Sequence, residues 1–83
     1  MEAGNILHRV TLESTALAWV CYLEQEHILQ VGLCSGREYE YSDVPLATYR
    51  QLLAAQSKGK YYNAHIRNHF RYRETCYPHT ARP

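Results

Sequence analysis

The chain lacks any apolar run near the roughly 20 residues that a membrane-spanning helix needs. Its first residues also lack the basic-then-apolar pattern of a secretion signal. It has three cysteines, an odd number without a repeated spacing, which argues against the disulfide framework of a small secreted protein. These absences predict a cytoplasmic protein that does not enter a membrane.

Short catalytic motifs are absent as well. The chain has no glycine-rich phosphate loop and no nucleophile elbow. Residues 44–83 contain a single carboxylate, Glu74, so a two-metal nuclease site would lack its ligands there. We therefore predict that the protein is not an enzyme and uses no cofactor.

Four residues near the end of the chain are weak candidates for metal ligands. His65 and His69 are four residues apart, which suits two zinc ligands on a helix, and Cys76 and His79 could close such a site. The chain has no Cys-x-x-Cys pair, and lone histidines on a solvated helix are the commoner outcome. The pattern favours no metal site, and a minimal hydrolase or zinc-dependent domain is the least favoured hypothesis.

What the chain does contain is tyrosine and an uneven distribution of charge. Eight of its ten aromatic residues are tyrosines, which suit half-buried positions and interfaces. Residues 1–43 carry two arginines and seven acidic residues, whereas residues 44–83 carry seven basic residues and one acidic residue. The basic half can attract a polyanion, although a solvated helix face beside an acidic sheet explains the same pattern.

The hydrophobic pattern of the first half predicts strands. An almost wholly apolar stretch covers Leu17–Leu23, a second apolar stretch covers 28–34, and strict alternation follows over 37–41. Ser35-Gly36 between the last two predicts a tight hairpin. The apolar residues of the first dozen positions suit either an edge strand or a packed arm.

Capping residues and helical spacing in the second half predict two short helices. The first follows Pro45, with Ser42 or Asp43 as its cap, and the second runs from about residue 60 to 70 after a cap at Ser57. From residue 71 the chain reads as a loose tail. The predicted fold is α+β: a three-stranded antiparallel meander followed by two helices packed on one face, in the order β-β-β-α-α. Eighty-three residues allow one domain with a small core.

The order of these features resembles the KTSC domain, which is named for its occurrence at the C-terminus of some lysyl-tRNA synthetases and also exists as a free-standing short protein. The central Tyr39-Glu40-Tyr41 matches the Tyr-x-Tyr signature of that family. The other matching positions are Ser14, Leu17, Tyr22, Leu29, Val31, Leu33, Gly36, Val44, Pro45, Tyr49, Leu52, Ala55, Ser57, Gly59, Tyr61, Asn63 and Ile66.

The resemblance predicts an N-terminal arm over 1–13, a KTSC-like domain over 14–72 and a C-terminal tail over 73–83. It implies a fold and hints at RNA binding, and it implies no reaction. The sequence departs from the family at Leu23-Glu24, where an Asp often follows the first-strand tyrosine, and at Leu33, where an aromatic residue is common.

Basic residues of the second predicted helix are the candidate nucleic-acid site. A spacing of three to four residues would align them on one face as a basic stripe. The alternative for this helix start is a capped turn in which Gly59 only supplies flexibility. The candidate residues are Lys58, Lys60, Asn63, Arg67, Arg71 and Arg73.

Four aromatic residues are candidates for stacking, core or interface positions. Tyr39 and Tyr41 lie on one face of the third predicted strand, and Tyr61 lies on the second predicted helix. These three rings could stack on bases or fill the core. Glu38 and Glu40 alternate with these two tyrosines and need the solvent-exposed face of the strand. The alternation therefore favours a core position for Tyr39 and Tyr41. Trp19 is a candidate interface residue, so a homodimer is a reasonable expectation.

Two functions follow from these patterns. We predict a non-catalytic RNA-binding module in which the basic stripe contacts RNA or another polyanion. The alternative is a small protein-interaction module, such as a phage or mobile-element factor that binds and inhibits a host protein.

Overall fold

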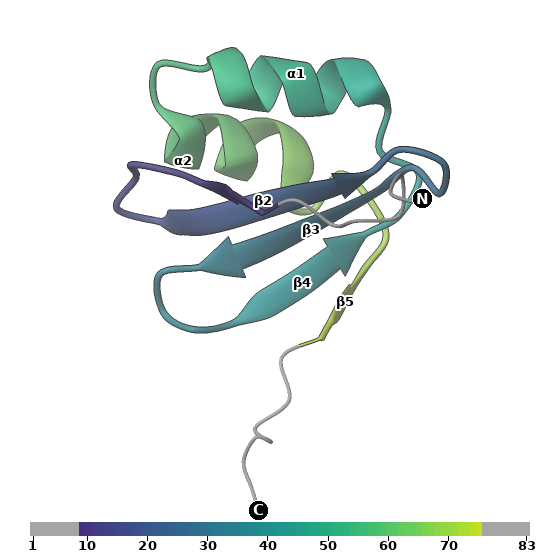
Figure 1. Cartoon of the computed structure of the whole chain (residues 1–83), viewed down its shortest axis with the longest axis horizontal. Helices are drawn as coiled ribbons and strands as arrows, with labels where there is room; N and C mark the ends of the chain where they lie inside the picture. Colours follow the sequence, from purple (N-terminus) through teal and green to yellow (C-terminus); the bar gives the residue numbers. More distant parts are fainter. Residues whose placement is uncertain (1–8, 76–83) are drawn as a thin grey trace, which may run out of the picture.

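A computed structural model describes residues 9–75 as a five-stranded antiparallel sheet with helices on one side (Figure 1). The strands lie in chain order: β1 Val10–Thr11, β2 Leu17–Leu23, β3 Ile28–Leu33, β4 Glu38–Tyr41 and β5 Tyr72–Glu74. The helices are α1 Leu46–Ala54, α2 Lys58–Tyr61 and η2 Tyr62–Ile66, a π-helix that continues α2. No helix within residues 9–75 is long and apolar enough to cross a membrane.

The sheet confirms the three predicted strands and adds one strand at each edge. β1 pairs with β2, so Val10–Thr11 form an edge strand and not a packed arm. Residues 1–8 of the predicted N-terminal arm lie outside the described residues. β5 pairs with β4, so the prediction of a loose chain from residue 71 is wrong for Tyr72–Glu74, as is the three-stranded meander. The rest of the predicted tail, 76–83, lies outside the described residues. Both added strands are short and exposed, so they lack the apolar alternation that marks a strand in the sequence. The α+β class is confirmed.

The register of the strands separates an apolar face from a polar face. One cross-strand row joins Tyr22, Leu29, Tyr41 and Tyr72, and this face lies toward the helices. On the opposite face Gln30 donates a hydrogen bond to Glu40 at 2.9 Å. The alternation of side chains along β4 therefore turns its tyrosines inward and its glutamates outward, as the sequence predicts.

The core lies between the apolar face of the sheet and the helices. The ring of Tyr22 stacks on Tyr49 of α1 with centroids 4.9 Å apart, and the Tyr22 hydroxyl donates to the carbonyl oxygen of Val44. The buried core residues are Leu12, Leu17, Val20, Leu29, Val31, Tyr41, Val44, Leu52, Tyr62 and Ile66. Burying these side chains is the main stabilising contribution in so small a domain.

The helix starts only partly follow the sequence prediction. The side chain of Ser57 accepts a hydrogen bond from the amide of Lys60 at 3.3 Å, which confirms the predicted cap. Pro45 itself occupies the cap position of α1, and no side chain caps that helix, so the prediction of Ser42 or Asp43 as its cap is wrong.

The second helical segment ends earlier than predicted. Residue Arg67 has an extended backbone with φ −61° and ψ 128°, and Asn68 follows with a φ of 70°. This left-handed residue turns the chain away from the helix axis and toward β5. The predicted helix over about 60–70 therefore stops at Ile66, and the residues after it belong to a turn and a strand.

Candidate functional site

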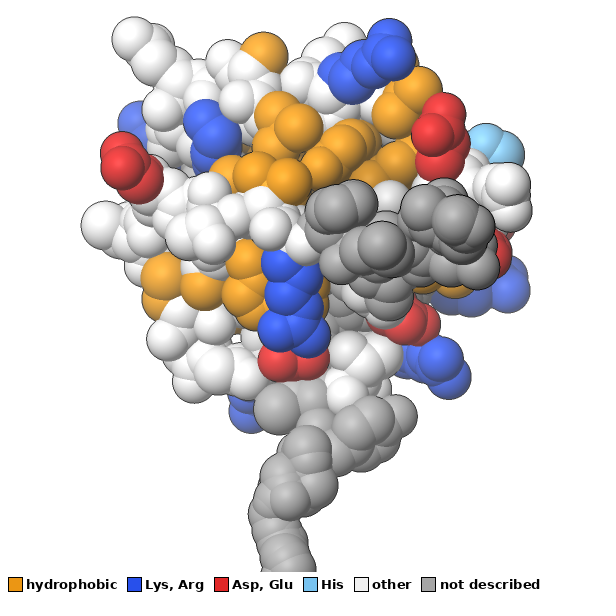
Figure 2. All heavy atoms as spheres, in the orientation of Figure 1, with side chains coloured by type: hydrophobic (Ala, Val, Ile, Leu, Met, Phe, Trp, Pro, Cys, Tyr) orange, Lys and Arg blue, Asp and Glu red, His pale blue; other side chains and the backbone are white. Residues whose placement is uncertain are grey.

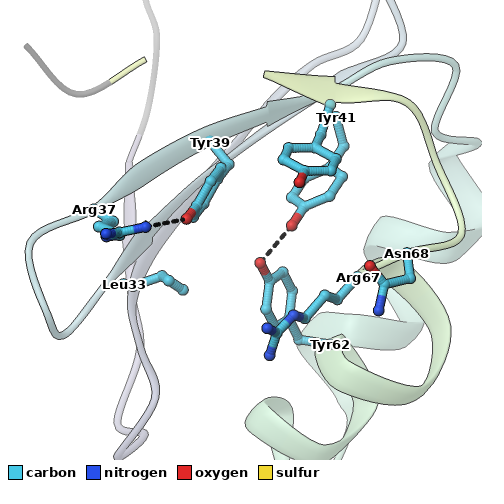
Figure 3. Close-up of a pocket in the computed structure, with 8 residues that line it drawn as sticks. Leu33, Arg37, Tyr39, Tyr41, Tyr62, Arg67 and Asn68 are labelled. Atoms are coloured by element: carbon cyan, nitrogen blue, oxygen red, sulfur yellow. Dashed lines mark hydrogen bonds between the residues drawn. The ribbon is translucent and has the colours of Figure 1, made fainter. Parts of the chain in front are cut away.

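A pocket of about 300 Å³ lies between β4, β5 and the chain that follows η2 (Figure 3). Its walls combine tyrosine rings with two guanidinium groups and one carboxamide. We call it the tyrosine pocket, and its lining residues are Leu33, Arg37, Tyr39, Tyr41, Tyr62, Arg67, Asn68 and Tyr72.

Strand pairing brings three of these rings together. Tyr39 and Tyr41 alternate on β4 and share a face, and Tyr72 of β5 pairs directly with Tyr41. The centroid of the Tyr72 ring lies 5.6 Å from the centroid of each of the other two rings. The interplanar angle is 75° with Tyr39, an edge-on contact, and 37° with Tyr41. Tyr41 is 2% exposed whereas Tyr72 is 54% exposed, so the cluster runs from the core to the solvent.

The deepest contact in the pocket joins two tyrosine hydroxyl groups. The hydroxyl oxygens of Tyr41 and Tyr62 are 2.5 Å apart, and Figure 3 shows them pointing at each other from the sheet and the helical segment. Burial raises the pKa of Tyr41, and the hydrogen bond to Tyr62 raises it further. Burial also raises the pKa of Tyr62. Both phenols therefore remain protonated and neutral through the physiological pH range.

The two arginines of the pocket differ in their partners. The Arg37 guanidinium donates to the hydroxyl of Tyr39 at 3.4 Å and lies 3.9 Å from a carboxylate oxygen of Glu74. The hydrogen bond with Tyr39 and the charge of Glu74 raise the pKa of Arg37. Within residues 9–75 the Arg67 side chain has no hydrogen bond or ion pair, and Figure 3 shows it extending past the ring of Tyr62. Arg67 is therefore an exposed cation whose charge no acidic side chain of the described residues balances through an ion pair.

Asn68 adds a neutral polar group beside Arg67. Its left-handed backbone places it in the turn that leads to β5, and its carboxamide has no hydrogen-bond partner among the described residues. A carboxamide offers both donors and an acceptor. Rings, a cation and a carboxamide around one hollow suit a flat ligand that also carries negative charge.

A second hollow contains the predicted helix start. It has a volume of about 410 Å³, and we call it the lysine hollow. Its lining residues are Glu13, Ser14, Thr15, Ala16, Gln56, Ser57, Lys58, Gly59, Lys60 and Asn63. Lys58 donates to the carbonyl oxygen of Ala55 at 2.9 Å, whereas Lys60 and Asn63 are exposed.

The candidate basic residues do not form the predicted helical stripe. Lys58, Lys60 and Asn63 line the lysine hollow, and Arg67 lines the tyrosine pocket. Arg71 precedes β5 and lines neither, and Arg73 lies 3.2 Å from a carboxylate oxygen of Glu40. Because the helix stops at Ile66, the predicted alignment of Asn63, Arg67 and Arg71 on one helix face is wrong. Lysines and arginines are dispersed over the face in Figure 2.

Two predicted aromatic candidates lie outside the tyrosine pocket. Tyr61 donates to the side-chain oxygen of Gln51 at 2.7 Å, and its ring lies 4.5 Å from the ring of His65. Trp19 lies on β2, and its indole occupies the space that a side chain at Gly32 would need. The guanidinium of Arg9 covers the indole at 4.0 Å, a cation–π contact.

The metal candidates do not come together in the described part of the chain. His65 lies in η2 and His69 in the turn that follows, and Cys76 and His79 lie outside the described residues. Within residues 9–75 no group of three or more histidine, cysteine and acidic side chains could hold a metal ion.

Several residues of the tyrosine pocket were not predicted as a site. Arg37 comes from the β3–β4 turn, Tyr62 from η2, Asn68 from the following turn and Tyr72 from β5, so no local motif contains them. The high tyrosine content was the only indication in the sequence.

Comparisons with known proteins identify the family and support the fold. The KTSC domain model matches residues 13–70. A protein of Stutzerimonas stutzeri described as uncharacterized is 36% identical over 67 residues, which are 80% of this chain and 94% of that protein. A protein of Tsukamurella paurometabola is 35% identical over 60 residues, 72% of this chain and 90% of that protein. The crystal structure of a KTSC domain protein from Yersinia pestis matches with a TM-score of 0.79 and 22% identity, over 84% of this chain and 99% of the other.

Proposed function

The chain belongs to the KTSC domain family, and from its tyrosine pocket we propose that it is a non-catalytic module that binds single-stranded RNA. One observation carries this proposal: exposed Tyr72 lies beside Tyr39 in a pocket that also holds Arg67, an arginine without an ion pair among the described residues. Stacking rings beside a cation are the usual means by which proteins hold single strands. The hint of RNA binding in the family resemblance is consistent with this proposal.

The rings would supply the sequence-tolerant part of the affinity. A base stacked on an aromatic side chain contributes about 1 to 3 kcal/mol. Tyr72 is 54% exposed, so its ring can meet a base without opening the core. The buried Tyr41 is part of the pocket wall and the core together, which is the arrangement that the alternation along β4 favours.

The remaining cations would hold the phosphates that flank the stacked base. Lys60 and Arg71 are exposed and have no ion pair among residues 9–75. Lys60 precedes the pocket residue Tyr62 by two positions and Arg71 precedes Tyr72 by one, so both cations lie close to pocket residues in the chain. Lys58 and Asn63 line the lysine hollow with Lys60. Arg73 contributes less, because Glu40 partly neutralises it. Such contacts are electrostatic and carry no base specificity.

A polarisation titration with labelled single-stranded RNA of about ten nucleotides at low salt tests the proposal. We expect saturable binding that Tyr72→Ala weakens by about tenfold, the loss of one stacking contact. Arg67→Gln should weaken it as well. Arg50→Gln on α1 removes the same charge from an exposed position outside the pocket, so it is the matched control. The absence of saturable binding by the unmodified protein would overturn the proposal.

The exposed sheet edges favour a second candidate, a protein-interaction module. No strand within residues 9–75 pairs with the outer edge of β1 or of β5. The exposed large apolar side chains in this part of the chain are Val10 and Tyr72. A partner strand could add to such an edge. Affinity purification from a lysate before and after nuclease treatment separates the candidates: a partner lost with nuclease supports RNA binding, and one that persists and binds as a purified protein supports the alternative.

A further inference from the structure

The hydroxyl pair in the tyrosine pocket leaves one hydrogen-bond donor unused. Tyr41 and Tyr62 are 2% and 4% exposed, and both line the pocket. Two hydroxyl groups carry two hydrogens, and the bond between them uses one. Neither hydroxyl has another hydrogen-bond partner within residues 9–75. Because a buried donor without a partner is costly, the remaining O–H favours a ligand with an acceptor such as a base carbonyl.

The angles between the rings limit the pocket to one base. Tyr39 and Tyr72 meet edge to face at 75°, so no slot between parallel rings exists for a base. A planar group can stack on one of these rings while the other meets its edge. The volume of about 300 Å³ is at the lower end of the range for small-molecule pockets, which also suits one small ligand.

The charges of the pocket provide for one phosphate. Arg37 is held by Tyr39 and Glu74, so its charge is partly balanced. Arg67 is exposed and has no side-chain partner among the described residues. Its planar guanidinium can bind a phosphate through two hydrogen bonds. Asn68 beside it can bond the ribose or the edge of the base.

We infer that the tyrosine pocket binds a single nucleotide with its phosphate, a nucleoside monophosphate unit that is either free or at the end of an RNA strand. The base stacks in the tyrosine cluster and accepts the unused hydroxyl hydrogen, and Arg67 holds the phosphate. This inference rests on the proposed function, since it makes the pocket the base-recognising part of the RNA site.

Competition between mononucleotides and labelled RNA tests the inference. The four ribonucleoside 5′-monophosphates, the matching nucleosides, and the same oligonucleotide with and without a terminal phosphate serve as competitors. We expect the monophosphates to compete at least about tenfold better than the nucleosides, because a charge-assisted bidentate contact is lost with the phosphate. Arg67→Gln should abolish this difference and Arg50→Gln should keep it.

The two sources of the ligand give different results. Tighter binding of the end-phosphorylated strand than of both the same strand without its terminal phosphate and the free monophosphate identifies a strand end. Equal binding of the two strands identifies a free nucleotide. Because Arg67 and Tyr72 are exposed, their variants should keep the fold, which circular dichroism and thermal melting verify. Tyr61→Leu, an aromatic change outside the pocket, is the control for Tyr72→Leu.

The inference and the proposed function fail in different ways. If RNA binds but no monophosphate competes, and Arg67→Gln and Tyr72→Leu have no effect, the single-nucleotide pocket is overturned and RNA binding stands. If RNA does not bind, but direct calorimetric titration shows monophosphate binding that Arg67→Gln weakens, the RNA module is overturned and the nucleotide pocket stands. If neither ligand binds, both fall.

Discussion

At the scale of single residues, Tyr41 and Tyr62 belong both to the hydrophobic core and to the wall of the tyrosine pocket. Each ring is buried, and the two hydroxyl groups share a single hydrogen bond. The alternation of side chains along β4 predicts that Tyr41 belongs to the core. It does not predict the partner, because Tyr62 is 21 positions away and its neighbour Tyr61 has the same side chain. Choosing between two adjacent tyrosines requires the exact rotation of the helical segment, which the π-helix changes.

The first prediction concerns the coupling within this pair. Tyr62→Phe leaves the Tyr41 hydroxyl without its partner, and we expect a loss of about 1 kcal/mol or more in the free energy of unfolding. Tyr41→Phe should have a similar effect. The double variant should lose less than the sum, because both hydroxyls are then gone. Urea unfolding monitored by circular dichroism measures all three. Additive losses would show that the bond contributes nothing.

The second prediction concerns pH. Burial raises the folded-state pKa of both Tyr41 and Tyr62 above the ordinary value of 10.0. The unfolded chain therefore releases these phenolic protons first, so their contribution to stability is complete below pH 10.0 and declines as the pH rises above it. Urea midpoints measured from about pH 8 to about pH 11 should fall in this direction. The Tyr41→Phe, Tyr62→Phe double variant should show a shallower decline, and an unchanged decline would contradict the assignment.

At the scale of secondary-structure elements, long and periodic segments were predictable and short ones were not. β2 has the predicted bounds, Leu17–Leu23, because seven residues of strongly apolar character suit a buried strand. β5 has three exposed residues, and its pairing with β4 supplies the interactions that its sequence does not reveal. The tyrosine pocket depends on β5 and on the early end of η2, so it could not be predicted from the sequence. The capping serine of α2 could, since that contact is local.

The third prediction concerns the pairing of β2 with β3. Trp19 lies opposite Gly32, and a Cβ at Gly32 would overlap the indole ring. Gly32→Ala should therefore lower the free energy of unfolding by about 1 to 3 kcal/mol, since the indole must leave its place. The same substitution in a Trp19→Leu background should cost less, which chemical unfolding of the four proteins measures. An equal cost in both backgrounds would mean that backbone effects, not the indole, set the requirement for glycine.

At the scale of the whole molecule, the charge of the basic half is distributed over several sites. The sequence correctly places most cations in the second half but cannot show that Arg73 meets Glu40 across the sheet. The sequence spacing predicts a basic stripe only if the helix continues past Ile66. The left-handed backbone of Asn68 is incompatible with a continuing helix, so the stripe does not form. The polyanion site that we propose therefore combines a pocket with flanking cations.

The fourth prediction uses this difference between cations. The logarithm of the RNA affinity should fall linearly with the logarithm of salt concentration, by about 0.7 for each phosphate contacted. Arg67→Gln should reduce the slope by about this amount. Arg73→Gln removes the same formal charge, but its guanidinium is 3.2 Å from Glu40, so we expect a smaller change. Equal changes in slope would indicate a diffuse attraction without a preferred arginine.

Because β5 lies at the edge of the sheet, its residue Tyr72 forms part of the pocket wall without belonging to the buried core. The KTSC match ends at residue 70, and Tyr72 lies just beyond it on a strand whose three residues are all exposed. A change at this position would alter the wall that meets the ligand in our proposal, while the buried residues stay as they are. If the proposed binding is real, evolution or protein engineering could therefore change its selectivity at β5, the last strand among the described residues, and leave the interior unchanged.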